Sequence, residues 1–260
     1  MPLFSANIST LYGEYPVLER VAQAASAGFD AIEIQFPYDE DPEAFARELE
    51  KHNLPLVLMN FPCGDLMSGG EGLAAVPGKQ REFEQALTLT EQFARILRPQ
   101  ALNLLSGQPG PQYDRDECEQ VFKDNLRKAY ELTRKHGIRL LTEPVNTVDL
   151  PDFYLHGTEQ AIELIESLPD IELFIQYDLY HMQIMESNLL ERIPEIIDRI
   201  GHFQFSDVPR RTEPGLGTID FEPVFSLIDS LGFEGYVGAE YFPTINTSAT
   251  LDWMRFDSNV

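Results

Sequence analysis

Short apolar runs alternate with longer amphipathic stretches along the whole chain. Such runs are typical of strands that are buried on both faces of a parallel sheet. The predicted strands are Phe4–Asn7, Ala31–Gln35, Pro55–Asn60, Ala101–Leu105, Arg139–Glu143, Leu173–Asp178, His202–Phe205 and Tyr236–Glu240. The stretches between them predict helices over Tyr15–Ala27, Pro42–His52, Gln80–Leu97, Asp116–His136, Thr158–Ser167, Leu189–Arg199 and Phe221–Leu231, with a final segment from Thr250.

The order of these elements predicts the fold class. Eight strand-and-helix units in a chain of this length are typical of a (β/α)8 TIM barrel, in which parallel strands close into a ring inside a layer of helices. A doubly wound open sheet is the alternative, but the first strand-to-helix turn, residues 7–13, has no G-x-G-x-x-G pattern. No proline-rich or Ser/Gly linker divides the chain, so we expect a single domain over residues 1–260.

The charge of the chain excludes some classes of partner. Its 260 residues include 43 Asp and Glu but only 19 Lys and Arg, which gives a formal net charge of -24. This excess repels phosphate backbones and anionic membrane surfaces, so we expect neither a nucleic-acid nor a membrane partner. No apolar run approaches the length of a spanning helix, and the first ten residues lack the pattern of a secretory signal. We expect a cytoplasmic protein, and the sequence leaves a homo-oligomer open.

Polar side chains mark the carboxyl ends of the predicted strands, where TIM barrels carry their chemistry. These residues are Asn7, Asn60, Glu143, Asp178, Glu240 and, within the seventh strand, Gln204. His181 follows Asp178 by three residues. A single glutamate at a strand end is often only an ion-pair partner, and an isolated asparagine is typical of a turn. Three carboxylates and an amide at neighbouring strand ends instead predict one shared site.

Clustered carboxylates need a compensating charge. Two carboxylates about 5 Å apart repel by roughly 3 kcal/mol at an effective dielectric constant near 20, which exceeds two pKa units. A divalent cation would remove this repulsion; oxygen ligands alone favour Mg²⁺ or Mn²⁺, and adding His181 would extend the choice to Zn²⁺ or Co²⁺. Without a metal, one glutamate stays protonated and the pair becomes an acid and a base. The residues alone leave both possibilities open.

Several short motifs accompany these strand ends. They are Phe4-Ser-Ala-Asn7, Ala27-Gly-Phe-Asp-Ala-Ile-Glu33, Phe36-Pro-Tyr38, Gly64-Asp65, Pro77-Gly78, Gln176-Tyr-Asp-Leu-Tyr-His181, Glu213-Pro-Gly215 and Gly238-Ala-Glu-Tyr241. In order and spacing, over nearly the whole chain, they resemble the hydroxypyruvate isomerase family within the xylose-isomerase-like TIM barrels. The resemblance implies reversible aldose–ketose isomerisation of a small hydroxy-carbonyl acid, with hydroxypyruvate and tartronate semialdehyde as the leading pair.

The resemblance also implies roles for individual residues. Glu143 and Glu240 correspond to the two acid/base glutamates of the family, and a divalent ion, Mg²⁺ or Mn²⁺, would lie among Glu143, Asp178, Gln204 and Glu240. We expect substrate contacts from Asn7, Asn60, His181, Arg211 and Glu213. Arg211 would grip the substrate carboxylate, since a guanidinium suits bidentate binding. Lys79 is a second cation that would do so, although a solvated loop charge explains it better.

Two loops depart from the family pattern. The segment after the seventh strand has Thr212 and Thr218 where the family commonly has His and Glu, and the loop after the third strand reads Gly69-Gly-Glu-Gly72. Both loops are expected to cover the substrate, so these changes bear on the choice of substrate more than on the type of reaction.

Other functions fit the same barrel. A 2-oxo-tetronate isomerase needs only a larger pocket, and sugar epimerases and inosose dehydratases share the fold. An AP-endonuclease-like phosphodiesterase needs a basic surface and more histidine ligands than this chain of five histidines and net charge -24 provides. A non-catalytic sugar-acid binding protein would bind substrate without exchanging the proton beside the carbonyl.

A few further residues have expected places. Glu33 lies inside the second strand and either contacts the site through water or is structural. His202 lies at the start of the seventh strand, away from the catalytic rim. Trp253 and Phe256 predict a packing or subunit-contact patch near the end of the chain.

Overall fold

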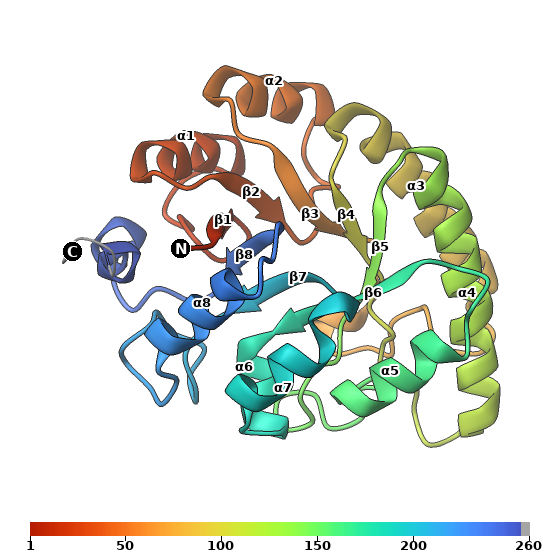
Figure 1. Cartoon of the computed structure of the whole chain (residues 1–260). Coiled ribbons are helices and arrows are strands. Elements are labelled where there is room, and N and C mark those ends of the chain that lie inside the picture. Colours follow the sequence, from red (N-terminus) through yellow and green to blue (C-terminus); the bar gives the residue numbers. More distant parts are fainter. Residues whose placement is uncertain (256–260) are drawn as a thin grey trace.

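The computed structural model describes residues 1–255, which form a closed barrel of eight parallel strands (Figure 1). Each strand pairs with the next along the chain, and the last pairs with the first. The strands are β1 (Leu3–Asn7), β2 (Ala31–Ile34), β3 (Leu56–Asn60), β4 (Ala101–Asn103), β5 (Arg139–Thr142), β6 (Leu173–Asp178), β7 (Ile200–Phe205) and β8 (Tyr236–Ala239). The predicted TIM barrel is confirmed.

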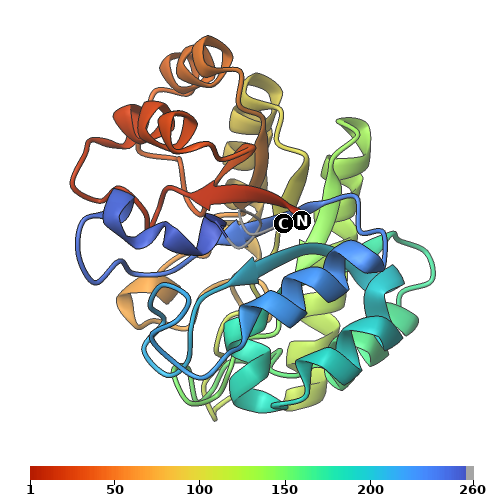
Figure 2. The same cartoon turned by 60° about the vertical axis from the view of Figure 1, so that its left-hand side comes forward.

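Helices cover the outside of the strand ring, as two views of the chain show (Figures 1 and 2). They are α1 (Val17–Ala27), α2 (Pro42–His52), α3 (Gln80–Leu97), α4 (Arg115–Lys135), α5 (Thr158–Glu166), α6 (Leu179–Met185), α7 (Leu189–Ile196) and α8 (Phe221–Ser230). The described residues also contain four 3-10 turns: η1 (Leu66–Ser68), η2 (Ile197–Arg199), η3 (Thr247–Thr250) and η4 (Asp252–Arg255).

The predicted boundaries differ from the observed ones mostly by one or two residues. The strands β5 and β8 stop one residue before Glu143 and Glu240, so both glutamates occupy the first position of a loop. The sequence analysis missed α6, whose start is capped by Asp178: its Oδ1 accepts a hydrogen bond from the backbone N–H of Tyr180. This capped turn carries His181 next to the strand end instead of releasing it into a loop.

Aromatic side chains pack β1, β7 and α8 against the turn η4 near the end of the described chain. The ring of Trp253 lies edge-on to Phe4 and Phe205, at centroid distances of 5.1 and 4.9 Å, and its N–H donates a hydrogen bond to the hydroxyl of Tyr241. Trp253 is buried, so it serves the packing expected of it. Phe256 lies outside the described residues. Within residues 1–255, no helix is long and apolar enough to cross a bilayer.

Candidate active site

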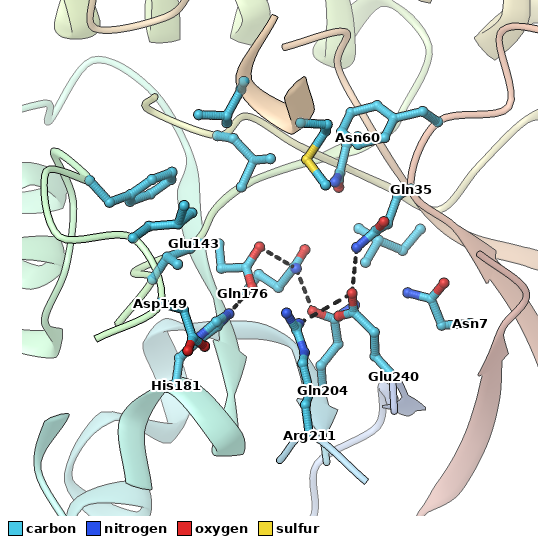
Figure 3. Close-up of a pocket in the computed structure, with 18 of the residues that line it drawn as sticks. Asn7, Gln35, Asn60, Glu143, Asp149, Gln176, His181, Gln204, Arg211 and Glu240 are labelled. Atoms are coloured by element: carbon cyan, nitrogen blue, oxygen red, sulfur yellow. Dashed lines mark hydrogen bonds and ion pairs between the residues drawn. The ribbon is translucent and has the colours of Figure 1, made fainter. Parts of the chain in front are cut away.

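A pocket opens at the carboxyl ends of the barrel strands (Figure 3). It encloses about 160 Å³. Its polar lining comes from strand ends and the loops after them: Asn7, Gln35, Asn60, Glu143, Asp149, Gln176, His181, Gln204, Arg211 and Glu240. The strand ends predicted to share one site therefore do meet, because a closed parallel barrel points all eight carboxyl ends at one rim.

One wall of the pocket is apolar. The loops after β2, β3, β4 and β5 contribute Phe36, Leu66, Met67, Leu105, Val145, Leu150 and Phe153. The two glutamates therefore face a cavity that excludes much of the surrounding water. A low-dielectric wall of this kind strengthens every charge interaction inside the pocket.

Glu143 is held by one of its two carboxylate oxygens. Its Oε2 accepts hydrogen bonds from Nδ2 of Asn103 at 3.1 Å and from Nε2 of Gln176 at 2.8 Å. Within residues 1–255, Oε1 accepts no hydrogen bond, and its near polar neighbour is Nε2 of His181 at 3.8 Å. Two amide donors thus fix the carboxylate and leave Oε1 available to a ligand.

Glu240 is held in the same one-sided way. Its Oε1 accepts a short hydrogen bond from Nε2 of Gln35 and lies 3.3 Å from Nη2 of Arg211. The same Nη2 lies 3.3 Å from Oδ2 of Asp178, so one guanidinium joins two carboxylates. Arg211 also stacks over Tyr180, 5.3 Å from the ring centroid. Across the described chain, Oε2 of Glu240 has no hydrogen-bond partner.

The tautomer of His181 follows from the contacts of Asn146. Oδ1 of Asn146 accepts hydrogen bonds from the backbone N–H groups of Val148 and Asp149, which leaves its Nδ2 to face Nδ1 of His181 at 2.7 Å. Nδ1 must therefore accept, and the neutral ring carries its proton on Nε2. This N–H points toward Oδ2 of Asp178 and Oε1 of Glu143, at 3.5 and 3.8 Å.

Burial controls the protonation of the site. It raises the pKa of Glu143 well above its usual range, reinforced by the negative charges of Glu240 and Asp178. It raises the pKa of Glu240 to about 8, although Arg211 opposes the shift. Burial also raises the pKa of Asp178, again against Arg211, and lowers the pKa of His181 well below its usual range. His181 is therefore neutral, and the carboxylates hold protons more tightly than exposed ones.

The chemistry of this donor set fits a divalent cation. Three buried carboxylates of Glu143, Asp178 and Glu240 meet one guanidinium, so ionisation of all three leaves an excess of negative charge that a divalent ion would balance. Ligand atoms of Glu143, Asp178 and His181 lie within 4.8 Å of one another. Since Nε2 of His181 carries a proton, we consider the oxygen atoms the better ligands and His181 a hydrogen-bond donor.

Three predicted residues do not line the pocket. Glu213 does not line the pocket: its carboxylate accepts hydrogen bonds from the N–H and the hydroxyl of Thr244, and so ties the loop after β7 to the loop after β8. Lys79 is the residue before α3 and is also absent from the pocket wall. Asp178 lies behind Arg211 and His181, with its side chain fully buried.

The loop that carries Arg211 is built around Asp207. This buried carboxylate accepts three backbone hydrogen bonds, from Gly215 at 3.0 Å, Gly217 at 2.8 Å and Ile219 at 3.1 Å. A side chain at Gly217 would meet the carbonyl oxygen of Val208 at 1.9 Å, so only glycine fits there. The folded loop directs Arg211 into the pocket and Glu213 away from it.

Sequence reasoning missed Gln35, Gln176 and Asp149 as pocket residues. Gln35 directly follows β2, the same signal that identified Asn7 and Asn60. Gln176 is two residues before Asp178 on β6, so the alternation of a strand predicts that it faces the same side. Asp149 lies in a loop, and nothing in its local sequence distinguishes it.

Comparison with known proteins identifies the family to which this chain belongs. The family described as "Xylose isomerase-like TIM barrel" matches residues 21–256, which is most of the chain. The chain belongs to this family. The hydroxypyruvate isomerase of Escherichia coli (strain K12) is 40% identical over 251 residues, 96% of this chain and 97% of the relative. A 2-oxo-tetronate isomerase of Cupriavidus necator is 33% identical over 255 residues, 98% of each.

Solved structures agree with this assignment. A crystal structure from Brucella melitensis, titled AP endonuclease, family 2, superposes with a TM-score of 0.93 at 38% identity and covers 98% of each chain. The 3-keto-D-glucoside 4-epimerase YcjR from E. coli superposes with a TM-score of 0.80 at 20% identity, which shows a shared fold alone. The relatives named hydroxypyruvate isomerase identify this chain as an isomerase of that family, as its motifs predict.

Proposed function

We propose that this isomerase interconverts hydroxypyruvate and tartronate semialdehyde, with Glu143 and Glu240 as the acid/base pair. The observation that carries the proposal is their matched arrangement. Each glutamate is fixed through one oxygen by neighbouring donors, and each leaves its other oxygen without a hydrogen bond at the same pocket. Proton transfer between two adjacent carbons needs two such groups.

The reaction balances with these two groups alone. One glutamate removes a proton from C3 of hydroxypyruvate, and the electron pair of that C–H bond forms the C2=C3 double bond of an enediolate. The π pair of the C2=O bond moves onto the C2 oxygen at the same time. The second glutamate then delivers its proton to C2, where the electron pair of the C2=C3 bond forms the new C–H bond. The proton of the C3 hydroxyl passes to the C2 oxygen, so C3 becomes the aldehyde carbon and C2 carries the hydroxyl. In the reverse direction the two residues exchange roles. The raised pKa of Glu240, about 8, suits a group that must both hold and release a proton near neutrality.

The remaining polar residues of the pocket bind and orient. The Nε2–H of His181 would donate to an enediolate oxygen, and Arg211 would hold a negatively charged oxygen of the substrate. Asn60 is oriented for the same purpose: its Oδ1 accepts from Nδ2 of Asn103, which turns its own NH₂ group away from that contact. The apolar wall would exclude water from the enediolate.

A divalent ion is part of this proposal. Glu143, Asp178, Gln204 and Glu240 would hold Mg²⁺ or Mn²⁺. When bound, the ion would polarise the substrate carbonyl and balance the negative charge that develops on its oxygen.

Deuterium exchange tests the proposal. Hydroxypyruvate is incubated with the protein in D₂O and followed by NMR; the native protein should introduce deuterium at C3 and form tartronate semialdehyde. Glu143→Gln and Glu240→Gln should each abolish both signals while retaining the fold. The matched control is Glu222→Gln, which removes an exposed carboxylate on α8 and should exchange normally. Binding of hydroxypyruvate by the native protein without exchange would refute isomerase activity on this substrate.

A further inference from the structure

Another buried carboxylate lies beneath the pocket. Glu33, the third residue of β2, is fully buried and accepts four hydrogen bonds. Its Oε2 accepts from the hydroxyl of Ser5 and faces Nε2 of His202, both at 2.7 Å. Its Oε1 accepts from Nδ2 of Asn7 at 3.1 Å and from Nε2 of Gln204 at 2.7 Å. These contacts are direct. His202, the third residue of β7, does not line the pocket and joins it through Glu33.

The barrel makes room for this carboxylate. A Cβ atom at Gly238 of β8 would lie 2.1 Å from Oε2 of Glu33, so the lack of a side chain there lets Glu33 cross the barrel toward β7. Burying a carboxylate is costly unless donors surround it, and here four donors do. An apolar side chain would fill this part of the core without the cost of burying a charge. A buried carboxylate with all four contacts satisfied therefore indicates a role beyond packing.

A chain of hydrogen bonds leads from Glu33 to Glu143. Gln204 donates to Glu33 with Nε2 and accepts with Oε1 from Nε2 of Gln176, and that same Nε2 donates to Oε2 of Glu143 at 2.8 Å. A carboxylate accepts but does not donate. Glu33 therefore fixes the direction in which each of the two amides points.

We infer that Glu33 is a positioning residue for the isomerase site, acting through Gln204 and Gln176 on Glu143. This inference rests on the proposed role of Glu143. With Glu33 in place, Gln204 must present its oxygen toward the pocket, and Gln176 must present its NH₂ group to Glu143. With an amide at position 33, Gln204 is no longer fixed, and when it turns over its NH₂ group faces the NH₂ group of Gln176. Gln176 can relieve that contact only by turning its oxygen toward the carboxylate of Glu143. That contact repels, so Glu143 loses its fixed orientation.

The central test is the isosteric change Glu33→Gln. We expect kcat for deuterium exchange to fall by about tenfold to 100-fold, in the range seen when groups that orient active-site ligands are removed. The urea midpoint of unfolding should fall, since an NH₂ group then faces buried donors. The variant should still be folded without urea, and kcat is compared under those conditions. The matched control is Ser5→Ala, which removes a donor to Oε2 and leaves the chain through Oε1 intact. It should retain nearly native kcat.

A rescue variant separates positioning from simple packing. Gln204→Glu alone sets two carboxylates against each other and should be at least as damaging as Glu33→Gln. The double change Glu33→Gln with Gln204→Glu moves the carboxylate from position 33 to position 204, one place closer to Glu143 in the hydrogen-bonded series. The carboxylate at position 204 again makes Gln176 present its NH₂ group, which donates to Glu143. We expect the double variant to recover at least part of the lost kcat. Strictly additive losses, or native kcat in Glu33→Gln, would overturn the inference.

A measurement without substrate keeps this inference apart from the proposed function. In protein labelled with ¹⁵N in glutamine side chains, the NH₂ signals of Gln176 and Gln204 should shift in Glu33→Gln and return toward native positions in the double variant. Unshifted signals in Glu33→Gln would refute the inference. If the signals shift as expected while native protein fails to isomerise hydroxypyruvate, the proposed function is wrong and the positioning role of Glu33 stands.

Discussion

The Nη2 atom of Arg211 lies 3.3 Å from Oε1 of Glu240, and the same atom lies 3.3 Å from Oδ2 of Asp178. A single guanidinium therefore compensates two carboxylates that come from different strands. Because the side chain of Arg211 is only 23% exposed, water screens these contacts weakly. The balance of charge at the rim thus depends on one residue of the loop after β7.

Removing this guanidinium should destabilise the protein. In Arg211→Met, the carboxylates of Asp178 and Glu240 lose their cation but stay buried, and breaking a buried ion pair in this way typically costs at least about 3 kcal/mol. We expect a loss of that order in the free energy of unfolding above pH 8, where Glu240 is ionised, measured by urea titration of metal-free protein. Arg210→Met, a change at the exposed neighbouring arginine, should have little effect. Equal stability of the two variants would contradict the structural role of Arg211.

The stability of metal-free protein should fall as the pH rises from about 5 to about 8. The folded pKa of Glu240 is raised from 4.5 to about 8, so between these values the folded state holds a proton that the unfolded state has released. Stability decreases with pH wherever the folded state binds more protons. The loss begins as pH passes the unfolded pKa and is complete above the folded one. In Glu240→Gln, urea midpoints across this range should show a shallower slope; an unchanged slope would exclude Glu240 as its source.

A divalent ion should oppose this loss. An ion that binds only folded protein stabilises it by about 2.7 kcal/mol at a concentration 100 times its Kd. After dialysis against EDTA, addition of Mn²⁺ should therefore raise the thermal midpoint, and more so at pH 8 than at pH 5, because protons compete for the same carboxylates. The readout is the midpoint, which is independent of turnover. Asp178→Asn should reduce the shift; no shift at saturating Mn²⁺ would contradict the metal proposal.

The carboxylate of Asp207 should prove essential to the loop that carries Arg211. In Asp207→Asn, an NH₂ group replaces an oxygen that accepts backbone hydrogen bonds, and buried donors are left unpaired. We expect a loss of about 1–3 kcal/mol in unfolding free energy and faster proteolysis within residues 208–219. Asp220→Asn, at an exposed aspartate before α8 that makes no capping bond, is the control. Cleavage at native rates in both variants would show that Asp207 does not hold the loop.

Much of the barrel could be predicted because its signals are local. Apolar runs such as those of β5 and β6 match the observed strands within a residue, since burial on both faces demands a continuous apolar sequence. The positions of Glu143, Asp178 and Glu240 at one rim then follow from topology alone. The helix α6 was missed because it is short and begins directly at a strand end. Its cap, Asp178, is an acidic residue at that strand end, which from the sequence alone indicates a site residue as much as a helix cap.

Directions of side chains could not be predicted in the same way. Glu213 and Arg211 are two residues apart in one loop, yet Arg211 enters the pocket while Glu213 binds Thr244. Backbone hydrogen bonds from Gly215, Gly217 and Ile219 to Asp207 fold the loop that carries both residues, and these bonds exist only in the tertiary structure. Gln35 binds Glu240 across 205 positions of sequence, a distance over which no local pattern carries information.

The sequence by itself determined the alternation of strands and helices, the barrel that this alternation closes, and the acidic chemistry at its rim, because periodicity and burial act between near neighbours in the chain. Only the tertiary structure decided which oxygen of each glutamate is held, which nitrogen of His181 carries the proton, and that Glu33 anchors the amides beneath the site. These properties depend on hydrogen bonds between strands that are distant in sequence, and their direction is settled when donors and acceptors from several strands must be satisfied together in a space without water.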